Sequence, residues 1–140
     1  MTQAILILLS LLAAFLTGDA WLGYEPIYQT AYGALTMMAA MISLTFLWLW
    51  ARRATPLALG MSFSWAGASS VLGWWWIYRL LEAPAAMVDS AALFVFLALY
   101  FCGAVLHFAV IGRSFGAPRL TFLLPILGAV GVSVLIQLIL

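Results

Sequence analysis

Lysine is absent from this 140-residue chain, and charged side chains make up only 6% of it. Soluble domains carry charge on about a quarter of their residues, so this chain has too few charges for a hydrated surface. Without lysine, a Schiff base to retinal or pyridoxal phosphate is also excluded. The composition predicts a protein whose main solvent is lipid.

Cysteine and histidine each occur once, as Cys102 and His107. A single cysteine excludes an intrachain disulfide, and its place inside an apolar run argues against a thiolate metal site. A single histidine cannot hold a b-type haem between two imidazoles, and no carboxylate shares its helix face. We therefore expect no metal site and no cofactor.

Motifs of catalysis and of nucleic-acid binding are missing from the sequence. It contains no Gly-x-Ser-x-Gly, no His-Glu-x-x-His and no phosphate-binding glycine loop. The net charge is +1, and Arg52–Arg53 is the largest basic cluster. We expect no nucleic-acid partner and no catalytic residues.

Long apolar runs are what the chain does contain, since 68% of its residues are hydrophobic and its mean hydropathy is +1.21. A hydrocarbon core of about 30 Å needs about 20 helical residues to cross it. The runs predict an all-α, polytopic transmembrane bundle in a single domain, 1–140. Its five helices are expected at about 4–24, 32–50, 56–81, 91–112 and 120–140. The first run lacks the basic start of a secretory signal, so we expect it to be retained.

The charges are sorted by sign along the chain. Four of the five arginines lie in the gaps after the second and fourth runs, at Arg52, Arg53, Arg113 and Arg119. The acids lie in or beside the alternate gaps. Because arginine favours the cytoplasmic side, the pattern predicts a cytoplasmic N-terminus and an outside (periplasmic) C-terminus. We expect an integral protein of the bacterial inner membrane.

The run 56–81 is the most polar of the five. On a helical wheel, Gly60, Ser64 and Gly67 share one face, while the nearly opposite face carries Ser62, Ala66, Ser69 and Gly73. Small residues let helices in lipid approach closely. Two such faces predict a central helix with neighbours on both sides. The arc from Met61 to Trp76 is expected to touch lipid or a partner.

Candidate functional residues gather first near the outside face. Asp19 is the only acid expected within the hydrocarbon region. It is either a residue on a transport path or an anchor whose carboxylate bonds to Arg79 or to the loop backbone. Arg79, Glu82 and Asp89, with Glu25, form either a mouth that attracts a cation or an ordinary solvated rim. In the rim reading, Arg79 is ion-paired and Asp89 or Ser90 caps the fourth helix.

A second group of candidates lies on the third and fourth runs, with His107 in the inner half of the fourth. Tyr100, Gly103 and His107 share a helix face, and Ser64 and Ser69 are the serines of the central helix that we count as binding candidates. His107 is either a proton relay or a histidine bonded to a serine or carbonyl of a neighbouring helix. In the last run, Pro125 predicts a kink, and Gly128 and Gly131 predict a close contact.

Three functions are compatible with these observations. The first is a permease- or channel-like protein for a small solute, acting as an oligomer with the helix 56–81 along the path. The alternative is a non-catalytic accessory subunit of a larger membrane complex. The third is a lipid- or quinone-modifying enzyme, which the lack of a converging acid–base pair argues against. The expected partners are the lipid bilayer and either further copies of the chain or a larger complex.

Overall fold

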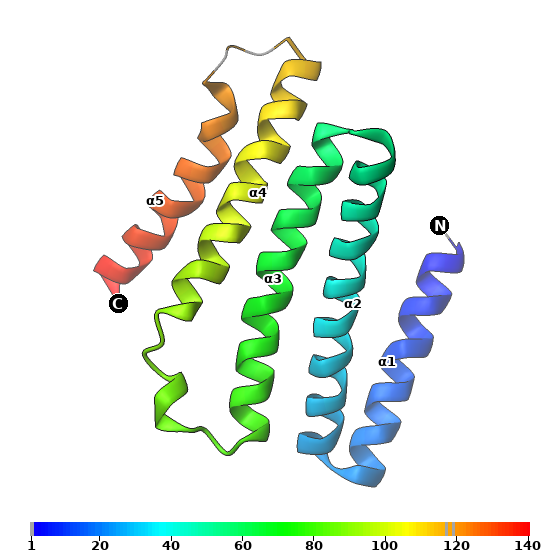
Figure 1. The fold of residues 1–140 in the computed structure, drawn as a ribbon. Coiled ribbons are helices and arrows are strands. Elements are labelled where there is room, and N and C mark those ends of the chain that lie inside the picture. Colours follow the sequence, from blue (N-terminus) through cyan, green and yellow to red (C-terminus); the bar gives the residue numbers. More distant parts are fainter. Residues whose placement is uncertain (1, 117, 119) are drawn as a thin grey trace.

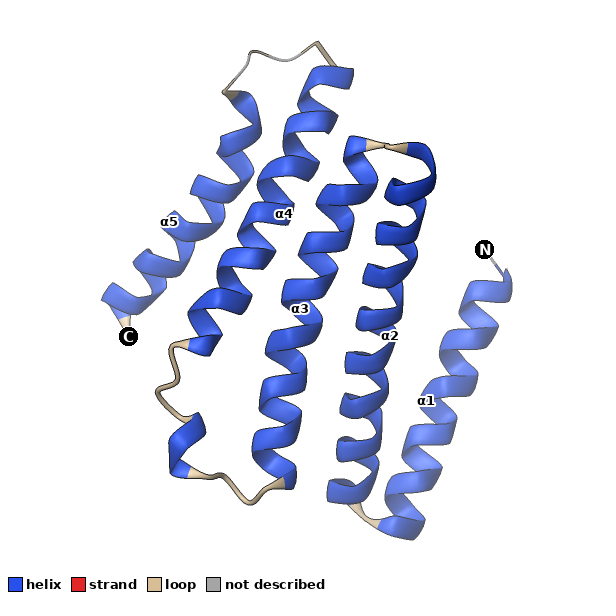
Figure 2. Cartoon of the chain, in the orientation of Figure 1, coloured by secondary structure: helices blue, strands red, loops and turns tan. Residues whose placement is uncertain are grey.

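The computed structural model describes residues 2–116, 118 and 120–140, and every regular element within them is helical (Figure 2). Five α-helices and two short 3₁₀ helices follow one another along the chain. They are α1 (Thr2–Leu22), α2 (Tyr24–Arg53), α3 (Pro56–Leu80), η1 (Ala85–Met87), α4 (Ala92–Ser114), η2 (Thr121–Leu123) and α5 (Leu124–Ile139).

The helices stand in a single row in chain order, each antiparallel to the one before it (Figure 1). The N-terminus and the α2–α3 and α4–α5 connections lie at one end, which we call the arginine end because it carries Arg52, Arg53 and Arg113. The α1–α2 turn, the loop with η1 and the C-terminus lie at the other end. We call this the acidic end, since Asp19, Glu25, Glu82 and Asp89 lie there. Arg119 falls outside the described residues.

Four stretches are long and apolar enough to cross a membrane: Thr2–Leu22, Tyr24–Arg53, Ala85–Ser114 and Thr121–Ile139. The last two include the 3₁₀ turns before α4 and α5. α3 is long enough, with 25 residues, but does not belong to this set. Its serines and glycines lower its hydropathy.

The connection between α1 and α2 is shorter than the sequence predicts. The second helix was expected from residue 32, but it begins at Tyr24, directly after Gly23. Gly23 turns the chain with a φ of 84° and donates its N–H to the Asp19 carbonyl at 2.9 Å. Glu25 and Pro26 lie in the first helical turn, where a carboxylate is favoured and proline breaks no hydrogen bond.

The prediction of a kink and a close contact in the last helix is wrong. Pro125 is the second residue of α5, where its missing N–H leaves no hydrogen bond unmade. α5 is preceded by η2 and starts later than expected. A Cβ added to Gly128 or Gly131 would meet nothing within 4 Å among the described residues. These two glycines pack against no neighbouring helix.

α3 lies at the centre of the row and packs on α4 through one small-residue face. A Cβ on Gly60 would lie 2.7 Å from the backbone N of His107. A Cβ on Gly67 would collide with the Tyr100 backbone, and one on Gly103 with the Ser64 backbone. The two helices therefore touch backbone to backbone, and only glycine fits at these crossings.

The other face of α3 packs on α2. The Ser43 hydroxyl donates a 2.8 Å hydrogen bond to the Ser62 carbonyl, and Ser62 is only 2% exposed. Towards the acidic end, the Trp76 ring covers Gly33, and Thr36 touches the position of Gly73. Trp76 therefore packs on α2 rather than only on lipid or a partner.

We predict that Gly103→Ala destabilises the fold while Gly128→Ala does not. The added methyl at Gly103 meets backbone that cannot move aside, so we expect a loss of about 1–3 kcal/mol or more in unfolding free energy. Gly128 faces open space, and alanine is the better helix former there. Thermal unfolding in detergent measures both. Equal melting temperatures for the two variants would contradict the backbone contact.

Candidate functional site

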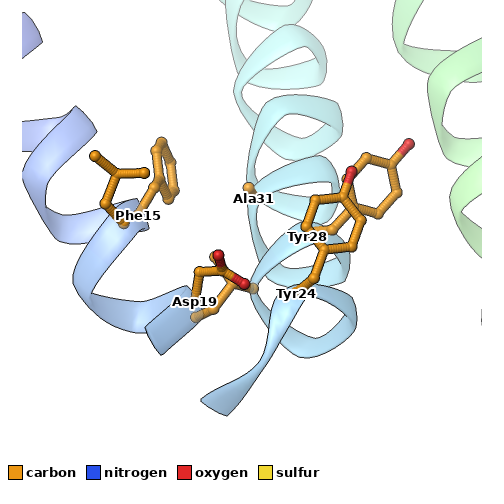
Figure 3. A pocket seen from close by; sticks show the side chains of 7 residues that line it. Phe15, Asp19, Tyr24, Tyr28 and Ala31 are labelled. Carbon is orange, nitrogen blue, oxygen red and sulfur yellow. The ribbon is translucent and has the colours of Figure 1, made fainter. Parts of the chain in front are cut away.

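A hollow of about 230 Å³ lies between α1 and α2 at the acidic end (Figure 3). Asp19 and Phe15 of α1 line one side, and Tyr24, Tyr28 and Ala31 of α2 line the other. The short Gly23 turn joins the two helices at this end, and α1 packs only lightly on α2. Asp19 is exposed at this site.

Tyrosines spaced four residues apart stack along α2 beside this hollow. The ring centroids of Tyr24 and Tyr28 are 5.6 Å apart, and those of Tyr28 and Tyr32 are 5.5 Å apart. The Arg79 guanidinium of α3 lies 4.9 Å from the Tyr28 ring centroid. Its cation thus meets an aromatic face. The predicted pairing of Arg79 with an acid is not seen among the described residues and stays a prediction.

The remaining acids at this end are spread over separate turns. Glu82 and Ala83 end α3 with φ values of 58° and 60°, and Glu82 and Asp89 are exposed. Ser90, not Asp89, accepts the N–H of Ala92 at the start of α4, at 3.3 Å. The structure does not bring Asp19, Glu82 and Asp89 together into one site among the described residues.

The α3–α4 seam brings together three of the predicted site residues. Ser64, Tyr100 and His107 line a second hollow of about 370 Å³, together with Met61, Trp65 and Phe108. The His107 Nδ1 atom is buried and has no hydrogen-bond partner among the described residues. For this nitrogen, the expected bond to a serine or carbonyl is not formed.

The fourth binding candidate of this group, Ser69, lies elsewhere. Its hydroxyl donates to the Ala66 carbonyl of its own helix at 3.1 Å, and it does not line the hollow. Sequence reasoning missed Trp65 and Phe108 as walls of the site. Trp65 lies one residue after Ser64 and Phe108 one after His107, so each polar residue has a large aromatic neighbour along the chain.

Comparison of the chain with protein-family models gives no match, and comparisons with curated proteins and with solved structures give none either. The functional proposal therefore depends on the geometry alone.

We predict that Arg79 and Tyr28 are coupled and that Asp19 takes no part. In a double-mutant cycle of Arg79→Gln and Tyr28→Leu, thermal unfolding should give a coupling of about 0.5–1 kcal/mol. The exposed Asp19, changed to Asn, should alter stability by less than about 0.5 kcal/mol and leave the coupling unchanged. A coupling that vanishes in the Asp19→Asn background would instead place Asp19 in an ion pair with Arg79.

Proposed function

We propose that all five helices cross the bilayer, including α3. α2 and α4 each have the length and hydropathy of a span, and α3 packs between them over its length. At about 1.5 Å per residue, its 25 residues extend about 37 Å. A helix in contact with two spanning neighbours can carry serines because its polar faces are turned towards protein.

The same proposal places the arginine end in the cytoplasm. Arg52, Arg53 and Arg113 lie at that end, and of the arginines in the described part of the chain only Arg79 lies at the acidic end. The positive-inside rule then gives a cytoplasmic N-terminus and a C-terminus outside, and we propose the bacterial inner membrane as the location.

Within that membrane, we propose that the chain is a non-catalytic subunit that works in a larger lateral assembly. The single layer of helices supports this role. A compact soluble monomer of 15.2 kDa exposes about 7,100 Å², whereas this chain exposes 10277 Å². No large side chain is fully buried in the described part of the chain. A stable interface needs about 800 Å² from each partner, which either face of the row supplies easily.

The second candidate is the permease-like oligomer. One row of helices has no interior, so a path would have to run between copies. The small and polar residues of α3 support such a path less than the sequence suggests. Gly60 and Gly67 pack against α4, and Ser62 packs against α2, so these residues are not free to line a path. Three polar residues still line an open hollow: Ser64, Tyr100 and His107. This polar cluster is the observation that supports the permease-like oligomer as the second candidate.

Topology can be tested by labelling single cysteines. With Cys102 replaced by alanine, we predict that an impermeant thiol reagent labels Ala85→Cys from the periplasm and Ser114→Cys only after the membrane is opened. Both positions are exposed and lie at opposite ends of the row. If both cysteines react from the periplasm, the number of spans between them is even and the proposed topology fails.

Assembly can be tested by native mass spectrometry after mild detergent extraction. We predict particles heavier than the 15.2 kDa chain. Different chains present in fixed stoichiometry would support the subunit. A pure homo-oligomer that gives solute flux in vesicles, altered by Asp19→Asn, would support the permease instead. A monomer without flux would contradict both.

A further inference from the structure

Two side chains of opposite charge lie at or beside the hollow between α1 and α2. Asp19 lines the hollow, and Figure 3 shows its carboxylate between the two helices. Arg79 lies over the ring of Tyr28, which lines the hollow as well. Both charged side chains are exposed, and neither makes a side-chain hydrogen bond within the described part of the chain. A negative and a positive group are therefore available to a ligand at the same place.

The contact of Arg79 with Tyr28 leaves the guanidinium able to bind an anion. A cation over an aromatic ring is attracted by the electrons of the ring face, and this attraction uses none of its N–H groups as hydrogen-bond donors. The fork of donors on an arginine matches the oxygens of a phosphate, which it binds through two parallel hydrogen bonds. Arg79 is thus held in place by Tyr28 with its donors available.

Both charges lie at the headgroup level of the proposed membrane. Asp19 is three residues before the end of α1, and Arg79 is the residue before the last of α3. Each is therefore within about 5 Å of the end of its helix. Tyr24 is 66% exposed at the same level, as aromatic side chains at a membrane interface are.

The rest of the hollow is apolar and extends towards the middle of the proposed membrane. Its walls there are Phe15 and Leu16 of α1 and Ile27 and Ala31 of α2. Ala31 follows Tyr24 by seven residues, which is about 10 Å along the helix. The ligand that fits has a cation and an anion at one end and an apolar chain at the other.

We propose that this hollow binds a phospholipid with an ethanolamine headgroup. Its ammonium donates hydrogen bonds to the Asp19 carboxylate beside Tyr24, whose ring face also attracts a cation. Its phosphate accepts hydrogen bonds from Arg79. One acyl chain lies in the apolar part of the hollow, between α1 and α2. The proposal rests on the membrane placement, which the cysteine labelling tests separately, and not on the subunit role.

Other occupants match only part of the site. An acyl chain without a headgroup meets neither charge, and an anionic lipid brings a second negative charge to Asp19. A second copy can exchange Asp19–Arg79 ion pairs with this one, but its helices are too large for the hollow. One helical turn, about 5.4 Å long and 10 Å wide, occupies about 420 Å³, whereas the hollow has about 230 Å³.

The test is a titration of the delipidated chain in detergent with dioleoylphosphatidylethanolamine, followed by native mass spectrometry. We expect saturable binding of one lipid per chain, at least fivefold weaker in Asp19→Asn and in Arg79→Gln. Dioleoylphosphatidylglycerol, which keeps the phosphate and both chains but has no ammonium, should also bind at least fivefold more weakly.

Matched control variants keep the hollow intact. Asp89→Asn removes another exposed acid of the acidic end, and Arg52→Gln removes an arginine that lies 5.8 Å from the centroid of the Trp48 ring. Both should bind the lipid like the parent. All the changed side chains are exposed, so we expect the variants to fold, and thermal unfolding checks this.

Photo-cross-linking gives a readout on the unchanged chain. An equimolar phosphatidylethanolamine with a diazirine near the ester of one acyl chain should label residues 15–19 and 24–31 at least fivefold more than residues 133–140. The latter are exposed on α5 and lie at the same end of the row. Even labelling of these segments overturns the proposal. So does equal affinity for phosphatidylglycerol, or unchanged affinity in Asp19→Asn or Arg79→Gln. Dimers of the lipid-free chain that Asp19→Asn dissociates would place a second copy at the hollow and overturn it too.

Discussion

The close approach of the α3 and α4 backbones is the contact on which the rest of the structure depends. In lipid, apolar side chains gain little by leaving one apolar environment for another, so helix association depends on van der Waals packing and polar contacts. Gly60 and Gly67 of α3 and Gly103 of α4 remove the side chains that would hold the two helices apart. A methyl group at any of these sites meets backbone.

The same principle explains why the row is one layer thick. α3 has two small-residue faces and therefore two close neighbours, whereas Gly128 and Gly131 of α5 face open space. α1 is apolar almost throughout and has no buried residue. Both edge helices pack lightly, α5 in spite of its two glycines, and their exposed leucines and isoleucines are suited to lipid or to another chain.

The spacing of small residues predicted the fold better than it predicted the site. Helical wheels placed Gly60 and Gly67 opposite Ser62 and Gly73, and the structure puts them against α4 and α2. Loops were harder, because proline and glutamate look like loop residues but are also stable in a first helical turn, as at Glu25 and Pro26. The partners of exposed charges could not be predicted from the sequence. Arg79 lies over the Tyr28 ring because of how far α3 is shifted along α2, and the sequence does not give that shift.

The hollow at His107 and the glycine contact have one cause. Where two backbones touch, the large residues next to the contact cannot lie between the helices and must project to the side. Met61 follows Gly60 along α3, and Trp65 and Phe108 follow Ser64 and His107. These side chains form the walls of the hollow, which Ser64 and His107 also line. Tight packing at the seam thus produces an open, partly polar site beside it.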